Sequence, residues 1–213
     1  MEPTIYKPSI YKGAGIYKTG AEGGGGGGGG GYGSLYFGDI YYPYKKIGSL
    51  YWATYNLCFY GDGIQLQGDG NDTPIGKDWG ANGGVDFLRG LYYNQKALVR
   101  LNEILPDGWR VADVSDWENL FNEFGGQLNC GKKILSKNIP MNGTNESEMN
   151  LYTIGYISGS NGVGVNAFVK IATPTNDGTH SKSFIFRNGQ NQVENYVAQM
   201  SDNFTSVRIC KDA

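Results

Sequence analysis

Nine consecutive glycines, Gly23–Gly31, divide this chain of 213 residues into two unequal parts. A polyglycine run has no side chains to bury, and ordering its backbone costs more conformational entropy than ordering any other sequence. In free solution such a run is a coil with a root-mean-square span of about 16 Å. It therefore cannot contribute to a packed core. We expect residues 1–35 to form an extended anchor and residues 36–213 to form one globular domain.

A short degenerate repeat precedes the glycines. Its three triplets are Ile5-Tyr6-Lys7, Ile10-Tyr11-Lys12 and Ile16-Tyr17-Lys18. Their spacing, five and then six residues, fits neither an amphipathic helix nor a solenoid repeat. Each triplet combines an apolar, an aromatic and a cationic group, which suits an extended segment that docks at successive pockets of another protein. A disordered tail with chance similarity is the alternative interpretation.

The glycine run also predicts self-association. Where several chains cross at a crowded axis, only glycine leaves enough room for the neighbouring backbones. We expect a homo-oligomer, with a trimer favoured, whose axis passes Gly23, Gly27 and Gly31. A phosphate-binding interpretation of the glycines fails, because no strand precedes the run and no helix follows it.

Composition excludes several classes of function. Only 39% of the residues are apolar, but 16 Tyr, 9 Phe and 4 Trp supply enough large side chains for a core. The 18 basic and 20 acidic residues are mixed along the chain, so no basic stripe indicates a nucleic-acid partner. No apolar run is long enough for membrane insertion. The N-terminus lacks the apolar segment of a secretory signal, which predicts synthesis in a cytoplasm.

Two helices are predicted in the globular part. Asn94 precedes an amphipathic segment that Pro106 stops. Ser115 and Glu118 match a capping box for a second helix, and Gly125-Gly126 is typical of its end. Trp109 and Trp117 are interpreted as core residues.

The remaining patterns predict strands. Residues 50–59 alternate and are rich in β-formers. Further strands are predicted at 165–173, at 183–187, from 192 onward after a tight turn at Asn188-Gly189, and at 204–210. We expect an α+β domain in which strands from its two ends pair.

Short motifs recur in order from residue 47 to the end of the chain. They are Ile47-Gly48 with Trp52 and Asn56-Leu57, Gly90 to Asn94 with Ala97, Pro106 to Val111 followed by Asp116 to Leu120, Gly131 to Ser136, and Ser206 to Arg208 with Lys211-Asp212. Together they resemble the Fibrobacter succinogenes major paralogous domain, although Gln95 stands where that family has tryptophan and residues 137–203 match poorly. The resemblance implies a C-type-lectin-like fold with two helices and a small antiparallel sheet. That scaffold displays variable loops in bacterial surface proteins and phage receptor-binding proteins.

The chain departs from this family at a disulfide. The resemblance implies paired cysteines at positions where this chain has Leu105 and Ile209. Because both residues are apolar, neither position leaves an unpaired cysteine. Cys210 follows directly, and in a strand its side chain would lie on the opposite face. The domain is therefore expected not to depend on an oxidising compartment.

Residues that support catalysis are sparse. The three cysteines, Cys58, Cys130 and Cys210, are far apart in sequence, and His180 is the one histidine. The same fold hosts formylglycine-generating oxidases, and their RLPTEAEWE block distantly resembles residues 110–118. Their copper(I) site needs paired thiolates, which this chain does not place close together in sequence. We expect no enzyme activity and no cofactor.

The sequence does not decide whether the polar loop at 61–86 binds calcium. Its oxygen ligands would be Asp62, Asp69, Asn71 and Asp72. The cluster lacks the spacing and the terminal glutamate of an EF-hand loop, and the tripeptides of calcium-dependent lectins are absent. A turn-rich loop is the favoured interpretation.

These features predict a phage virion protein made in the bacterial host, a head fibre in preference to a tail fibre because the chain is short. The anchor would attach to a capsid or tail protein, and the domain would bind a host surface glycan or protein. Candidate ligand contacts are Trp79, Tyr92, Tyr152 and Tyr156, in or near the loops at 61–86 and 137–163. The alternative is a surface-displayed or secreted bacterial module of the same family that binds glycan or protein.

Overall fold

The computed structural model describes residues 31–66, 74–77, 90–138, 140–152, 154–158, 161–163, 167–173, 180–199 and 203–213. The Ile-Tyr-Lys triplets and the glycines Gly23 and Gly27 lie outside the described residues, as does Trp79. Gly31 is described, and its carbonyl accepts a hydrogen bond from the Lys46 amide.

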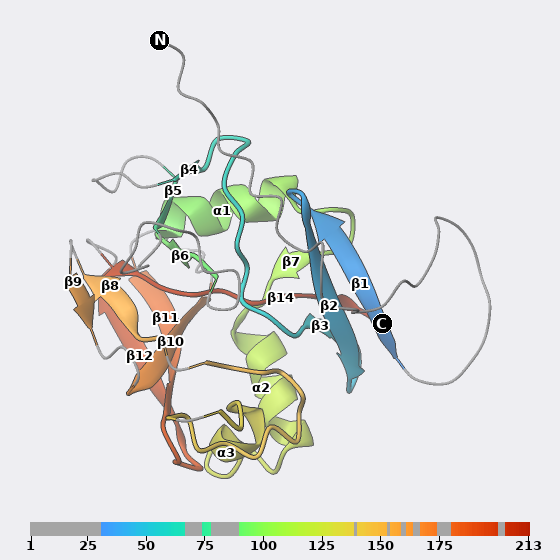
Figure 1. The fold of residues 1–213 in the computed structure, drawn as a ribbon, viewed down its shortest axis with the longest axis vertical. Coiled ribbons are helices and arrows are strands. Elements are labelled where there is room, and N and C mark those ends of the chain that lie inside the picture. The colour runs from blue at the N-terminus through green and yellow to red at the C-terminus, as the bar shows by residue number, and fades with distance from the viewer. Residues whose placement is uncertain are drawn as a thin grey trace.

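The described residues form a mixed α+β fold with mostly antiparallel sheets and few helices (Figure 1). The helices are α1 (Gln95–Ile104), α2 (Val114–Glu123) and α3 (Gly131–Ile134). The strands are β1 (Tyr32–Phe37), β2 (Ile40–Ile47), β3 (Leu50–Ala53), β4 (Gln65–Leu66), β5 (Ile75–Lys77), β6 (Tyr92–Tyr93), β7 (Arg110–Val111), β8 (Tyr156–Ser158), β9 (Asn161–Val163), β10 (Phe168–Thr173), β11 (His180–Arg187), β12 (Val193–Gln199), β13 (Asn203–Phe204) and β14 (Ile209–Asp212).

The largest sheet has five strands in the order β1-β2-β3-β14-β7, and all neighbours in it are antiparallel. The expected pairing of strands from both ends of the domain is therefore confirmed, with Cys210 opposite Trp52. The hairpin β1–β2 was not predicted, and it begins at Tyr32, inside the expected anchor. Its two-residue turn, Gly38-Asp39, has φ angles of 59° and 62°, which suit the twist of a tight hairpin.

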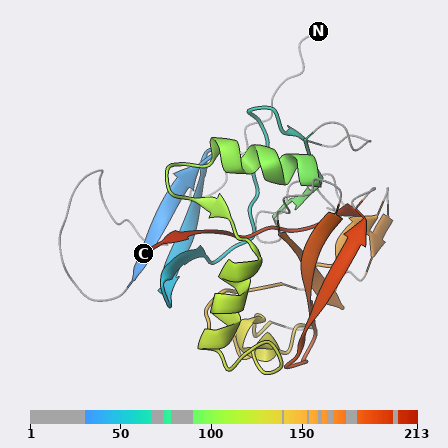
Figure 2. The same ribbon diagram turned by 180° about the vertical axis from the view of Figure 1, so that it is seen from behind.

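The five-stranded sheet has a hydrophobic cluster on each face. Leu35, Tyr42 and Ile209 belong to a cluster that includes the buried side of α1. Trp52 and Cys210 point to the other face, into a cluster with α2, β10 and β11. In Figures 1 and 2, α1 and α2 accordingly lie on opposite sides of β14. The prediction that Ile209 and Cys210 face opposite ways is confirmed.

Aromatic rings organise the cluster around α2. The Trp117 ring centroid lies 5.0 Å from that of Trp52, 6.0 Å from that of Phe121 and 5.8 Å from that of Phe186. Trp117 and, on the other side of the sheet, Trp109 are both buried, which confirms their interpretation as core residues. Leu105 and Ile209 share the cluster around α1, so apolar burial occurs where the resemblance implies a disulfide.

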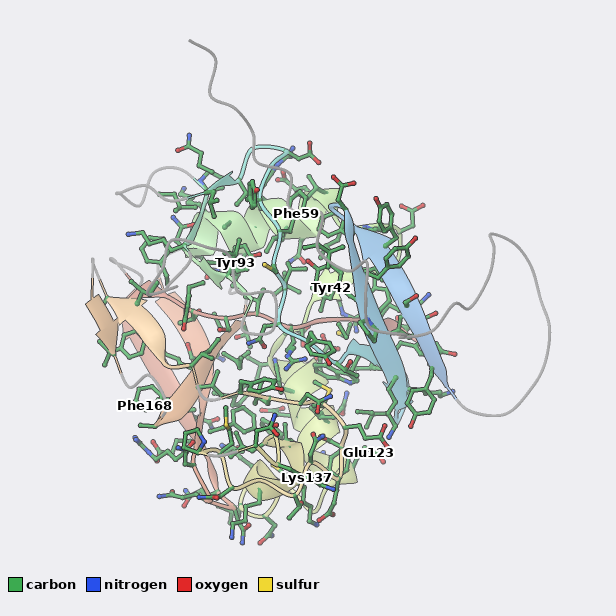
Figure 3. The ribbon with its side chains drawn as sticks, viewed as in Figure 1. Tyr42, Phe59, Tyr93, Glu123, Lys137 and Phe168 are labelled. Carbon is green, nitrogen blue, oxygen red and sulfur yellow. The ribbon has the colours of Figure 1, made fainter. Side chains whose placement is uncertain are left out.

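The strand predicted at 50–59 is shorter than expected, because β3 ends at Ala53. The residues that follow are held by tyrosine side chains and by backbone hydrogen bonds outside a regular ladder, such as that from the Leu57 amide to the Val207 carbonyl at 3.1 Å. The Tyr42 hydroxyl accepts a hydrogen bond from the Cys58 amide at 3.1 Å. The Tyr93 hydroxyl accepts one from the Phe59 amide at 2.7 Å and donates one to the Phe59 carbonyl at 3.0 Å. In Figure 3, the labelled Tyr42, Phe59 and Tyr93 lie in the same part of the molecule as α1.

The strand predicted at 204–210 is likewise divided, into β13 and β14. Between them Arg208 is buried, and its guanidinium donates hydrogen bonds to the carbonyls of Ala53 at 3.1 Å and Asn150 at 3.3 Å. Elsewhere the expected C-terminal hairpin is present as β11–β12, with Gly189 at a φ of 65° in its turn.

The ends of α1 and α2 can be compared with those predicted from local sequence patterns. The prediction for α1 is confirmed, since the Asn94 side chain accepts a hydrogen bond from the Ala97 amide at 3.0 Å. The end of α2 at Gly125-Gly126 is confirmed by positive φ angles of 97° and 83°. The start of α2 was predicted wrongly.

The capping box of α2 is formed by Asp113 and Asp116, two residues before the predicted pair of Ser115 and Glu118. The Asp113 carboxylate accepts from the Asp116 amide at 2.9 Å, and Asp116 accepts from the Asp113 amide at 3.0 Å. Arg110 donates to both carboxylate oxygens of Asp116, at 3.1 and 2.7 Å. This ion pair favours the earlier start, which the pattern S-x-x-E does not reveal.

Replacing Asp113 with Ala should lower the free energy of unfolding by about 1 kcal/mol, because the Asp116 amide loses its acceptor. Glu118→Ala, at an exposed position of the same helix, is the matched control and should change stability by less than about 0.5 kcal/mol. Urea denaturation followed by far-UV circular dichroism measures both. If Glu118→Ala lowered the free energy of unfolding as much as Asp113→Ala, the capping box predicted from Ser115 and Glu118 would be supported instead.

Candidate recognition surfaces

One face of the β1–β2 hairpin is exposed and aromatic. Alternation along the strands and the pairing of Tyr32 with Lys45, Ser34 with Pro43 and Tyr36 with Tyr41 place these six residues on one face, which we call the tyrosine face. The opposite face of the hairpin carries Leu35 and Phe37 into the core. The tyrosines keep much of their surface in solvent: Tyr32 is 61% exposed, Tyr36 54% and Tyr41 70%.

The charged groups around the tyrosine face are engaged by neighbouring side chains. The Lys45 ammonium lies 2.9 Å from a Glu148 carboxylate oxygen, and the Tyr32 hydroxyl donates to the other oxygen at 2.8 Å. The hydrogen bond from Lys45 lowers the pKa of Glu148. The Tyr36 hydroxyl donates to Asp39 at 2.8 Å, which raises the pKa of Tyr36. The face therefore presents rings beside one ion pair and one carboxylate that accepts a tyrosine hydroxyl.

A second surface lies at the other end of the domain. The strands β4, β5, β8 and β9 lie there, far from the β1–β2 hairpin in Figure 1 and again in the reverse view of Figure 2. We call this the loop end, because these strands flank parts of the loops predicted at 61–86 and 137–163. Those predicted loops thus contain short strands.

Aromatic and cationic groups also meet beside the loop end. The Lys170 ammonium lies 4.7 Å from the centre of the Tyr156 ring, and the Tyr156 and Phe168 rings are 6.1 Å apart. Arg187 lies 5.5 Å from the Phe168 ring and pairs with Glu194 at 2.7 Å. Figure 3 shows Phe168 on the side of the molecule away from the hairpin. Burial lowers the pKa of Lys170 to about 8.

The predicted ligand contacts occupy different environments. Tyr92 is only 3% exposed, and its hydroxyl donates to the Ile154 carbonyl at 2.6 Å, so it packs in the core instead of facing a ligand. Tyr152 is half-buried against the core, and its hydroxyl accepts from the Asn138 amide at 3.1 Å. Tyr156 lies half-buried in β8. Of the three predicted contacts that the structure describes, it is the one that belongs to the loop end. Trp79 lies outside the described residues.

The three cysteines are free and buried. Burial raises the pKa of the Cys130 thiol to about 12 and also raises that of Cys210. Cys210 donates a weak hydrogen bond to Asp116 at 3.3 Å. A neutral, buried thiol is a poor nucleophile, so Cys130 and Cys210 have the properties of structural cysteines.

Within the described part of the chain, no three His, Cys, Asp or Glu side chains gather as a metal site would require. Of the proposed calcium ligands only Asp62 is described, and its carbonyl accepts a hydrogen bond from Arg100 at 2.7 Å. None of the described helices has the length and apolar character needed to cross a membrane. Comparisons with protein families, with curated proteins and with solved structures found no match to this chain.

The tyrosine face was missed by the sequence analysis. Its first residues were assigned to the anchor because they follow the glycines directly. Two signals identify it in retrospect: tyrosine, serine and tyrosine alternate with leucine and phenylalanine over residues 32–37, and Gly38-Asp39 is a hairpin turn. Together they predict a strand with one buried and one exposed face.

Tyr92→Phe should lower the free energy of unfolding by about 1–2 kcal/mol, because it removes a buried hydrogen bond to the Ile154 carbonyl. Tyr41→Phe, at the most exposed of the three face tyrosines, is the control and should be neutral within about 0.5 kcal/mol. Urea denaturation compares the two variants. An unchanged stability for Tyr92→Phe would contradict its assignment to the core.

The pKa of Lys170 predicts a pH-dependent stability. Burial lowers this pKa from 10.5 to about 8, so between these values the unfolded chain binds the proton that the folded chain has released. The Lys170 contribution to the free energy of unfolding therefore rises as pH increases through this window. Relative to Lys170→Met, the wild type should gain about 1–3 kcal/mol between about pH 7 and about pH 10.

Urea denaturation at the two pH values measures this difference. Lys182→Met, which changes an exposed lysine of the neighbouring strand, is the control and should retain the full rise. If the free energy of unfolding rose equally in Lys170→Met, the pH dependence would come from other titratable groups.

Proposed function

We propose that this protein is a structural component of a phage virion, a head fibre in preference to a tail fibre. Its N-terminal segment attaches to a capsid or tail protein, and its domain binds a glycan or protein on the host surface. In this proposal the domain has a C-type-lectin-like fold and belongs with the Fibrobacter succinogenes major paralogous domains. It acts by recognition, without catalysis.

The observation that carries the proposal is the polarity of the domain. The chain enters the domain at Gly31, at the start of β1, on the end formed by the β1–β2 hairpin. The last residue, Ala213, hydrogen-bonds Ser49 close to the same sheet. The loop end lies at the opposite side in Figures 1 and 2. A domain attached through its N-terminus would thus direct its loop end away from the attachment point.

The architecture supports the lectin-like assignment. Strands from the beginning and end of the domain pair as β3 and β14, α1 and α2 pack on opposite faces of that sheet, and the short strands β4, β5, β8 and β9 lie at the far end. Rigid scaffolds of this kind carry recognition on their loops. The Tyr156 and Phe168 rings beside the loop end provide apolar contact area.

The cysteines support assembly in a reducing compartment. All three are buried as free thiols, and the implied disulfide positions hold the buried pair Leu105 and Ile209. A protein that folds in the host cytoplasm and then joins a particle needs no oxidation step. A secreted module would more commonly use the disulfide.

Several copies would be displayed together in this proposal. The glycines at Gly23, Gly27 and Gly31 would allow backbones to approach at an oligomer axis, and a trimer is favoured. Clustering raises weak individual contacts to useful avidity, because each further contact becomes intramolecular. The Ile-Tyr-Lys triplets would supply the repeated contacts with the particle.

Deletion of residues 1–30 tests the proposal. The cut leaves β1 intact, since Gly31 and the strand after it remain. The truncated protein should fold, as shown by circular dichroism and a cooperative melt, but should be absent from purified phage particles. Full-length protein should be present on them. A matched full-length variant with Ile5, Ile10 and Ile16 changed to Ser should lose incorporation while it keeps the glycine run.

Incorporation of the truncated protein into particles would refute the anchor. Recovery of full-length protein in the bacterial envelope, and on no particle, would favour the bacterial surface module. A glycan array with residues 31–213 then asks whether a host saccharide binds at the loop end. Tyr156→Ser serves as a loop-end variant in the same array.

A further inference from the structure

We propose that the tyrosine face of the β1–β2 hairpin, together with the free edge of β1, binds a second copy of this chain. This surface is distinct from the loop end. The inference adds a contact between copies to the proposed function. It rests on that function, because the proposed anchor is what gathers several copies. The proposed contact explains four properties of the hairpin.

The first property is the concentration of exposed rings. Six large apolar or aromatic side chains are exposed in the described part of the chain, and Tyr32, Tyr36 and Tyr41 are three of them. The Tyr36 and Tyr41 ring centroids are 4.8 Å apart, so these two rings form one continuous surface. Scattered exposed apolar residues need no explanation, whereas a cluster on one face indicates an interaction site.

The second property is an unprotected sheet edge. β1 is the outermost strand of the five-stranded sheet, and no described strand pairs with its outer side. Its sequence, YGSLYF, contains no charged residue and no proline. Proteins usually protect such edges with lysine, proline or a bulge, because an unprotected edge pairs readily with another chain. An edge of this composition therefore suits a protein partner that adds backbone hydrogen bonds.

The third property is the low charge of the face. Lys45 pairs with Glu148 at 2.9 Å, and Asp39 accepts the hydrogen bond of Tyr36. The face thus carries one ion pair and one further carboxylate at the turn, so two identical faces meet little of the repulsion that like charges opposite each other would cause. The Tyr32 and Tyr36 hydroxyls are already engaged by carboxylates, which leaves few polar groups for a saccharide. A second copy therefore fits this surface better than a glycan.

The fourth property is the position of the hairpin in the chain. β1 is the first described strand, and only the twelve residues 19–30 separate Gly31 from the last Ile-Tyr-Lys triplet. Covalent geometry limits that separation to about 43 Å. Copies whose triplets share one attachment site therefore keep their hairpins at an effective concentration on the order of millimolar. A contact of low intrinsic affinity is then sufficient.

Sedimentation velocity of the full-length protein over a range of concentrations provides the first test. The wild type should show a reversible equilibrium between monomer and oligomer. The double variant Tyr36→Thr/Tyr41→Thr, which keeps β-forming residues in the hairpin, should weaken association at least about tenfold, as expected for loss of two central rings. Tyr60→Thr is the control, because Tyr60 is exposed but lies outside the hairpin, and it should associate like the wild type.

Circular dichroism and melting temperature must be unchanged in the double variant for its loss of association to support the contact. A wild type that stays monomeric at millimolar concentration would overturn the proposal. So would a double variant that associates normally. Loss of glycan-array binding in the double variant, with association unchanged, would assign the face to a saccharide and also overturn it.

Disulfide trapping provides a second test that does not depend on affinity. The native cysteines are buried, so a cysteine placed at Tyr36 would be the reactive thiol of the described domain. Mild oxidation of full-length Tyr36→Cys should give a covalent dimer, and Tyr60→Cys should not. Equal yields from the two variants would exclude a contact through this face. Neither result depends on particle incorporation, so failure of this contact is distinguishable from failure of the proposed virion function.

Discussion

The insertion of β14 between β3 and β7 is the constraint on which the rest of the fold depends. This strand comes from the very end of the chain, and its consecutive side chains, Ile209 and Cys210, enter the two clusters on opposite faces of the sheet. Neither cluster can be completed before the C-terminus is in place. The two halves of the domain are therefore coupled, and we expect folding to be cooperative, with many contacts between residues far apart in sequence. Among the described strands, β1 forms one edge of the same sheet and has no partner on its outer side.

Features with local causes could be predicted from the sequence, and features with tertiary causes could not. The start of α1 at Asn94 and the end of α2 at Gly125-Gly126 depend on neighbouring residues, and both predictions are confirmed. The start of α2 depends on Arg110, which lies outside the helix and holds Asp116. The backbone after the end of β3 is bound by the hydroxyls of Tyr42 in β2 and Tyr93 in β6 and by the Val207 carbonyl. A period-two pattern contains no information about such partners.

The candidate surfaces illustrate the same difference. Tyrosine alternates easily between core and surface, because its ring is apolar and its hydroxyl needs one partner. Tyr92 finds that partner inside the molecule, at Ile154, whereas Tyr41 remains exposed. Nothing in their sequence neighbourhoods separates these outcomes. The choice follows from which face of each strand meets α1 or α2, which is a property of the assembled sheet. The hairpin itself was recognisable, but the glycines beside it favoured its assignment to the anchor.

A hairpin contact between copies would also organise the loop ends. The β1–β2 hairpin and the loop end lie on opposite sides of the domain, so copies that meet through their hairpins would hold their loop ends apart and facing outward (Figure 1). The edge of β1 that no described strand covers, an aggregation hazard in an isolated domain, would then be covered by the assembly that the proposed anchor would promote. Association and recognition would use separate surfaces, and substitutions at the loop end could change the ligand without disturbing the contact between copies.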